Sequence, residues 1–330
     1  MTGPCLARVD GTDETHMEAT MNNLTKFGKP LIELSRIGFG AWQLANPLWG
    51  EVDEAESVRL VRSAIEKGVN FFDTAPGYAG GSSETILGRA IGADRGRVAV
   101  STKFGHLPDG SSDWRVAAIE PSLRASLSRL KTTYVDSFLL HNPSTEILEG
   151  RTGHFEELAR LKRLGLIRAY GVSIDTREEL KTILERTDVD VVELLFNVFF
   201  QSPRDLFEEV RRKRIFLVAK VPLDSGWLTG KYDEHSIFTG IRSRWTRTDV
   251  ERRAELVRKP KDILGHEDTS YDALAYILSY DAVACVIPGI KSIRQMNDNL
   301  AALHHPLSAE TKWRIEDLYD REIRRDPLPW

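Results

Sequence analysis

The chain has 330 residues, 41% of them hydrophobic and 28% charged, and a formal net charge of −4. This length suits two domains or a single α/β barrel, and the charge provides no basic field for nucleic acid or an anionic membrane. No apolar run approaches the length of a membrane span. The two cysteines, Cys5 and Cys285, have neither disulfide nor zinc spacing. We therefore expect a cytoplasmic protein with no bound metal and no nucleic-acid or membrane partner.

The N-terminal segment is interrupted by acidic residues such as Asp10 and Glu18, so it lacks the apolar core of a signal peptide. We expect residues 1–20 to be a disordered extension and residues 21–330 to form a single domain. At the start of this domain, residues 22–34 contain two short apolar pieces around a glycine and a lysine. This pattern predicts a β-hairpin that closes the bottom of the fold.

Short apolar runs then alternate with longer amphipathic stretches. Eight runs are mostly continuous in apolar residues, which is typical of parallel strands buried on both faces. These predicted strands are residues 35–40, 70–75, 98–103, 136–141, 169–174, 191–197, 215–222 and 282–289. Helical periodicity between them predicts helices at residues 54–67, 122–130, 155–164 and 176–186.

Eight alternating strand–helix units predict an α/β fold of the (β/α)8 TIM-barrel type. The alternative is an open doubly wound sheet, but residues 37–42 have no glycine fingerprint that leads into a helix. After the seventh strand, residues 230–266 form a long polar segment, which we expect to be a loop. On a barrel such a loop leaves the C-terminal face, where active sites lie.

Four polar side chains follow neighbouring predicted strands. Asp73, Lys103 and His141 end the second, third and fourth strands, and Tyr78 lies in the loop after the second. Each alone has an ordinary interpretation as a helix cap, a solvated lysine, a structural histidine or a loop aromatic. Because the C-terminal ends of barrel strands meet at one mouth, their joint occurrence favours a catalytic site.

These residue types together can support the reduction of a carbonyl group. A phenol is a poor acid at neutral pH because its ordinary pKa is about 10, and a nearby ammonium lowers that pKa. An aspartate keeps the ammonium charged, and a neutral histidine can donate a hydrogen bond to the carbonyl oxygen. The phenol then protonates the developing alkoxide.

Several short motifs surround these residues. They are GVNFFDTAPGY at residues 68–78, STKFG at 101–105, LLHNP at 139–143, GLIR at 165–168, GVS at 171–173 and LTGKY at 228–232. In combination they resemble the aldo-keto reductase family, and the resemblance extends from about residue 32 to residue 299. It implies a reductase that acts on a small carbonyl substrate and whose catalytic tetrad is Asp73, Tyr78, Lys103 and His141.

The resemblance also implies NADPH or NADP+ as cofactor, extended across the barrel mouth without a Rossmann domain. The diphosphate is expected near residues 222–226 and the adenine end near residues 287–299. There Lys291 and Arg294 suit a 2′-phosphate, and Ser292 begins a helix whose N-terminal amides favour anions. The implied cofactor residues are Trp42, Asp73, Ser173, Glu193, Lys220, Val221, Pro222, Leu223, Ser225, Gly226, Lys231, Gly289, Lys291, Gln295, Asp298 and Asn299.

Three positions depart from the family pattern. Ile174 stands where asparagine is usual, Glu193 replaces a usual glutamine, and Lys220 aligns with an aromatic that often stacks on the nicotinamide. Ile174 removes a donor and an acceptor, and an ionised Glu193 accepts hydrogen bonds but cannot donate them. We therefore expect altered anchoring of the nicotinamide carboxamide, which bears on turnover more than on the fold.

The substrate is not encoded in these motifs, because sites of this fold vary by their loops. Aldehydes and ketones, including keto-sugars, are the expected class. The expected substrate contacts are Trp42, Tyr78, Phe104 and His141, and further walls or a lid are Trp49, Trp114 and residues 242–245. The alternative function is a nucleotide-sensing binding protein with little turnover, which the three departures favour and the complete tetrad disfavours. A metal-dependent barrel hydrolase would need paired histidines after the first strand, and residues 38–43 contain none.

Overall fold

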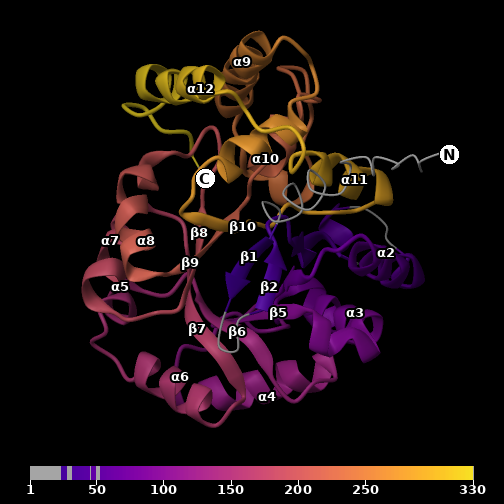
Figure 1. Cartoon of the computed structure of the whole chain (residues 1–330), viewed down its shortest axis with the longest axis vertical. Helices are drawn as coiled ribbons and strands as arrows, with labels where there is room; N and C mark the ends of the chain where they lie inside the picture. The colour runs from indigo at the N-terminus through magenta and orange to yellow at the C-terminus, as the bar shows by residue number, and fades with distance from the viewer. Residues whose placement is uncertain (1–23, 28–31, 45, 50–52, 330) are drawn as a thin grey trace, which may run out of the picture.

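The computed structural model describes residues 24–27, 32–44, 46–49 and 53–329; the expected extension at residues 1–20 lies outside them. Eight parallel strands form one curled sheet in sequence order. Isolated parallel bridges join Ile37 to Val286 and Gly40 to Gly289, so the first strand also meets the last. The sheet thus closes into the predicted (β/α)8 barrel, with helices outside it (Figure 1). The strands are β3 (Phe39–Gly40), β4 (Phe71–Asp73), β5 (Ala99–Phe104), β6 (Val135–His141), β7 (Ile167–Ile174), β8 (Val191–Leu195), β9 (Phe216–Lys220) and β10 (Val283–Val286).

The helices around the barrel include the four that periodicity predicts, each within three residues of its expected bounds. Helix α7 begins with a capping box, in which Thr176 Oγ1 accepts from the Glu179 amide and the Glu179 carboxylate accepts from the Thr176 amide. The helices are α2 (Glu54–Glu66), α3 (Ser82–Ile91), α4 (Ile119–Leu130), α5 (Thr145–Leu148), α6 (His154–Arg163), α7 (Arg177–Arg186), α8 (Phe207–Lys213), α9 (Arg247–Leu264), α10 (Ser270–Leu278), α11 (Ile293–Ala301) and α12 (Ala309–Glu322).

The N-terminal hairpin is confirmed. Strands β1 (Leu24–Phe27) and β2 (Ile32–Ser35) pair antiparallel, and Figure 1 places them against the barrel strands. Leu34 is fully buried in a cluster with residues that begin strands, including Phe71, Ala99 and Phe216. The hairpin therefore covers the N-terminal end of the barrel interior and leaves the C-terminal end for chemistry.

The segment after β9 differs from the expected long loop, because residues 247–264 form helix α9. This helix has its own capping box between Thr246 and Asp249, and it buries Val250, Ala254 and Val257 at helical spacing. Charged residues surround this narrow apolar stripe, which obscures it in the sequence. Helix α9 packs against α12. None of the helices in the described ranges is long and apolar enough to cross a membrane.

Candidate active site

A cavity of about 870 Å³ opens where the strands end. Its walls include Asp73 at the end of β4, His141 at the end of β6 and Lys220 at the end of β9, with Tyr78 from the loop after β4. Parallel strands that end together thus bring side chains from distant parts of the chain to one mouth. A cavity of this size is in the range of ligand and cofactor sites.

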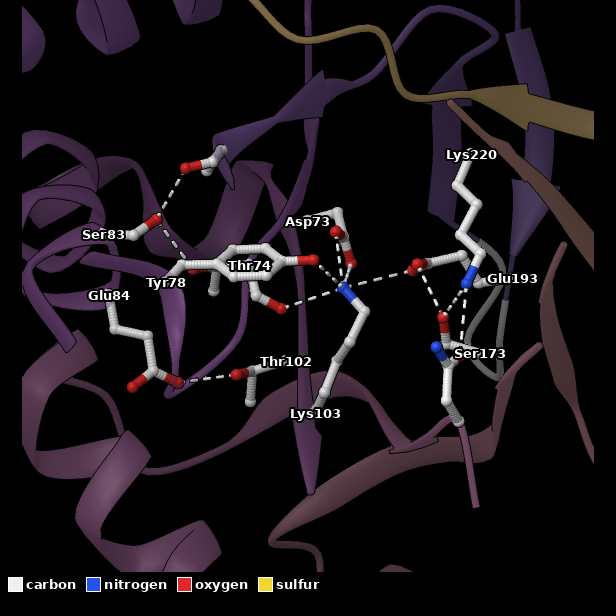
Figure 2. A network of polar contacts seen from close by, with 12 residues as sticks. Asp73, Thr74, Tyr78, Ser83, Glu84, Thr102, Lys103, Ser173, Glu193 and Lys220 are labelled. Atoms are coloured by element: carbon white, nitrogen blue, oxygen red, sulfur yellow. Dashed lines mark hydrogen bonds and ion pairs between the residues drawn. The ribbon is translucent and has the colours of Figure 1, made fainter. Parts of the chain in front are cut away.

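Lys103 is the centre of a buried polar network, shown in Figure 2, and is itself fully buried. Its Nζ donates to both carboxylate oxygens of Asp73 at 2.7 and 2.6 Å and to the Thr74 carbonyl at 3.1 Å. The same nitrogen lies 3.5 Å from the phenol oxygen of Tyr78 and 3.3 Å from Oε2 of Glu193. The structure therefore brings three of the four tetrad candidates into direct contact and adds a second carboxylate.

The charges around Lys103 determine which groups carry protons. Burial alone would lower the pKa of Lys103, but the carboxylates of Asp73 and Glu193 outweigh it and raise that pKa. Burial raises the pKa of Tyr78 far above that of a free phenol; Lys103 opposes this, and the two carboxylates reinforce it. The expected lowering by lysine is therefore outweighed. Tyr78 holds its proton at neutral pH, which is the form that a proton donor needs.

His141 is the fourth tetrad candidate and lies beside Tyr78, with ring centroids 6.1 Å apart. Burial lowers its pKa well below the usual value, and the charges of Lys103 and Lys220 lower it further. The imidazole is therefore neutral at pH 7. Its Nδ1 is buried and has no hydrogen-bond partner among the described residues. This arrangement suits a group that orients a polar ligand without carrying charge.

A second chain of contacts joins the tetrad to the cavity wall. Ser173 Oγ donates to Oε1 of Glu193 at 2.9 Å and accepts from Nζ of Lys220 at 2.9 Å. Lys220 also forms an ion pair with Asp175 at 2.8 Å. Burial would raise the pKa of Glu193, but Lys103 and Lys220 together lower it. Glu193 is therefore an ionised acceptor, and Ile174 beside it is fully buried in the core.

Most residues implied for the cofactor line this cavity. The exception is Ser173, which is buried behind Glu193 and Lys220. The loop after β9 has positive φ at Val221 (53°) and Ser225 (55°), and such strain persists only where the surroundings hold it. Here the Asn197 amide donates to the Val221 carbonyl at 2.9 Å.

A buried ion pair fixes the next part of this loop. Asp224 has a φ of 43°, and its Oδ2 lies 3.1 Å from Nε of Arg253 in α9, with neither side chain exposed. Arg253 also donates to the carbonyl of Pro329 at 2.6 Å. Helix α9 and the C-terminal segment therefore both support the backbone that is expected to face the cofactor diphosphate.

Three cations that lie near one another line the cavity, namely Lys231, Arg242 and Lys291. Arg242 lies 4.5 Å from the ring centroid of Trp49, and Lys291 donates to the Trp49 carbonyl. Burial and the charges of Arg242 and Lys231 lower the pKa of Lys291, which is the sign of crowded positive charge. This donor set fits an anionic group such as the phosphates of a nicotinamide dinucleotide. Arg294 does not line the cavity, and its side chain is 89% exposed.

The structure places one of the expected substrate contacts outside the cavity. Phe104 is fully buried and packs against Trp114, with ring centroids 5.7 Å apart, and neither residue lines the cavity. Strand β5 includes both Lys103 and Phe104. Since neighbouring strand residues point to opposite faces, the inward Lys103 turns Phe104 toward the surrounding helices. Trp42, Trp49, Tyr78 and His141 do line the cavity.

Sequence reasoning missed several cavity residues. Asn142 directly follows His141 in the motif at residues 139–143, so that motif contained a signal for it. His106 and Asp175 come from the loops after β5 and β7, and Gln43 follows Trp42. Their places depend on loop conformation, for which the sequence carries no comparable signal.

The fold and the grouped polar side chains are those of a nicotinamide-dependent oxidoreductase on a TIM barrel. The sequence profile of the Aldo/keto reductase family matches residues 36–320, and the chain belongs to this family.

Individual relatives agree with this assignment. The chain is 28% identical over 282 residues to the uncharacterized oxidoreductase YqkF of Bacillus subtilis (strain 168), covering 84% of this chain and 90% of the relative. It is 27% identical over 304 residues to the NADH-specific methylglyoxal reductase of Escherichia coli (strain K12), covering 84% and 92%. The holo form of aldo-keto reductase AKR11C1 from Bacillus halodurans superposes with a TM-score of 0.74 at 26% identity, covering 90% and 96%.

Proposed function

We propose that the protein reduces an aldehyde or ketone with NADPH and that Tyr78 donates the proton. The observation that carries this proposal is the Tyr78 hydroxyl at the cavity wall, 3.5 Å from the buried Lys103 ammonium. Burial raises the pKa of Tyr78, so the phenol keeps the proton that it would donate. Neutral His141 lies beside it. These groups supply a proton donor, a charge that stabilises its conjugate base and an orienting imidazole.

In this mechanism His141 donates a hydrogen bond to the substrate carbonyl oxygen and directs it toward the Tyr78 hydroxyl. When bound, the nicotinamide supplies the hydride that reduces the carbonyl carbon. Tyr78 gives its proton to the developing alkoxide, and the adjacent Lys103 ammonium stabilises the phenolate that forms. Asp73 holds Lys103 through two short contacts and keeps it charged.

The choice of NADPH over NADH rests on Lys231, Arg242 and Lys291, three neighbouring cations that line the cavity. The 2′-phosphate of NADPH is the anion that such a cluster would distinguish. A relative that is 27% identical over 304 residues is named as NADH-specific. The preference of this chain is therefore tested with both cofactors.

The test combines a binding and a turnover measurement. NADPH is titrated into the protein while the cofactor fluorescence is followed, and nicotinamide absorbance is then followed with aldehydes, ketones and keto-sugars. We expect Tyr78→Phe to bind NADPH like the wild type and to lose about 100- to 10,000-fold in kcat. Normal turnover by Tyr78→Phe would overturn the assignment of the proton donor. If NADPH binds tightly but no carbonyl compound in the panel oxidises it, the result would instead favour a nucleotide-sensing protein.

A further inference from the structure

Lys103 interacts with two carboxylates, although Asp73 and the Thr74 carbonyl together already accept from its three N–H donors. The second carboxylate belongs to Glu193, whose Oε2 lies 3.3 Å from Nζ of Lys103 and whose side chain is 3% exposed. Buried carboxylates are costly unless they are paired. A neutral glutamine of nearly the same size would avoid this cost, so a glutamate here changes the charge of the network without needing a different shape.

Glu193 is also held on its other side, as Figure 2 shows. Its Oε1 accepts from Ser173, which in turn accepts from Lys220. Both carboxylate oxygens therefore have partners, and its charge is directed at Lys103. Because Lys103 Nζ contacts the Tyr78 hydroxyl, Glu193 acts on the phenol through one intervening ammonium.

We propose that Glu193 is a positioning residue that restrains the proton on Tyr78, by sharing the Lys103 ammonium as a second carboxylate. The inference deepens the proposed function and rests on it. The Lys103 ammonium stabilises a Tyr78 phenolate less when two carboxylates already offset the charge of that ammonium. The phenol therefore keeps its proton to higher pH than it would beside Lys103 and Asp73 alone.

Charged and titratable groups from every side of the network enter this balance. Three groups face Tyr78: Lys103 in β5, Asp73 in β4 and His141 in β6. Three groups likewise face Glu193: Lys103, Asp73, and Lys220 in β9. His106 lies 5.0 Å from the His141 ring centroid, and Asp175 neutralises part of the Lys220 charge.

The consequence is a pH dependence of known sign. Reduction needs protonated Tyr78, so its rate falls as pH rises through the pKa of that phenol. Removing the Glu193 charge favours the phenolate and moves this fall to lower pH. Oxidation of the alcohol needs the phenolate, so the rise of its rate with pH moves to lower pH by the same amount.

The matched variants are Glu193→Gln and Ser173→Ala. Glu193→Gln keeps a side chain of similar shape and removes the charge, whereas Ser173→Ala removes the hydrogen bond to Glu193 and keeps the charge. We measure kcat/KM against pH in both reaction directions for both variants and the wild type. We expect Glu193→Gln to shift both profiles to lower pH by roughly half to one pH unit and Ser173→Ala to leave them in place. A change in KM for the cofactor in either variant does not bear on this test, which compares the pH at which each profile changes.

A titration without turnover keeps this test separate from the proposed activity. The ultraviolet difference signal of phenolate is recorded against pH in the cofactor-free protein, and the signal of Tyr78→Phe in the same background is subtracted. The Tyr78 component should appear at lower pH in Glu193→Gln than in the wild type. If no carbonyl is consumed, the reductase proposal fails, and this titration still decides the role of Glu193. Unshifted titration, or equal shifts in both variants, would overturn the inference.

Discussion

The ammonium nitrogen of Lys103 lies 2.6 Å from Oδ2 of Asp73, and the two side chains are 0% and 4% exposed. A buried ion pair gains little net stability, because desolvation offsets most of the Coulomb attraction. Its retention at the cavity therefore indicates a role beyond stability. Burial and the charge of Glu193 raise the pKa of Asp73, which shows how strongly the site depends on the single cation between them.

Lys103→Met should destabilise the fold by about 3–5 kcal/mol at neutral pH, because it leaves the buried Asp73 carboxylate without its cation and leaves Glu193 with the charge of Lys220 alone. A carboxyl whose pKa is raised in the folded state contributes stability that is fully present below its unfolded pKa of about 4 and is lost as pH rises through the raised folded pKa. The cost of the substitution should therefore shrink as pH falls. Urea unfolding at several pH values measures it.

The control for this prediction is Lys181→Met, at a side chain that is 55% exposed beside Glu185. An exposed pair contributes about 0–1 kcal/mol, so this variant should stay close to the wild type at every pH. If Lys103→Met costs the same at neutral and acid pH, lost packing explains the effect better than unpaired charge.

His141 should make the stability of the wild type fall with acid. Its folded pKa lies well below that of a free histidine because it is buried among cations. A base with a lowered folded pKa contributes stability above its unfolded pKa of about 6.5, and that stability is lost as pH falls toward the folded pKa. His141→Gln lacks this titration. The stability advantage of the wild type over His141→Gln should therefore decline from about pH 7.5 to about pH 5.5. A constant difference in denaturation midpoints would show that His141 does not titrate as stated.

The grouping of Asp73, Lys103 and His141 was predictable because these residues lie at the ends of strands that are neighbours in both sequence and space. Asp73, Lys103 and His141 each follow an apolar run, and parallel pairing of β4, β5 and β6 aligns these ends. Helix α9 was not predictable as readily, since its buried Val250, Ala254 and Val257 stand among charged residues. There tertiary packing, more than propensity, determines the helix.

Other site features depend on contacts that no local pattern encodes. Arg242 meets Trp49 across nearly two hundred residues of chain, and the pairing of Glu193 with Lys103 needs the barrel to close. Phe104 faces away from the cavity because β5 continues one residue past Lys103 and places Phe104 on the opposite face of the strand. The sequence thus predicts where the strands end. Loop conformation and closure of the barrel determine which further side chains lie beside the residues at those strand ends.

Gly171→Ala should be severely destabilising, because a Cβ at this position would lie 1.7 Å from the carbonyl oxygen of Val191. Residues 171 and 191 are partners where β7 pairs with β8, so neither backbone can move without breaking the ladder that positions Ser173 and Glu193. We expect a loss of about 3 kcal/mol or more in unfolding free energy. Gly96→Ala is the control, since nothing lies within 4 Å of its added Cβ. Similar melting temperatures for the two variants would contradict this account of β7 and β8.

Lys291→Ala should weaken the binding of NADPH more than that of NADH. Lys291, Arg242 and Lys231 are neighbouring cations in the cavity lining. A charged hydrogen bond to phosphate contributes about 1.5–3 kcal/mol, which corresponds to roughly 10- to 100-fold in Kd. Fluorescence titration of the two cofactors gives the ratio of their dissociation constants. Arg294→Ala is the control, because that side chain is 89% exposed and does not line the cavity. Equal losses for both cofactors in Lys291→Ala would assign the cluster to the diphosphate, which NADH and NADPH share, and not to the 2′-phosphate.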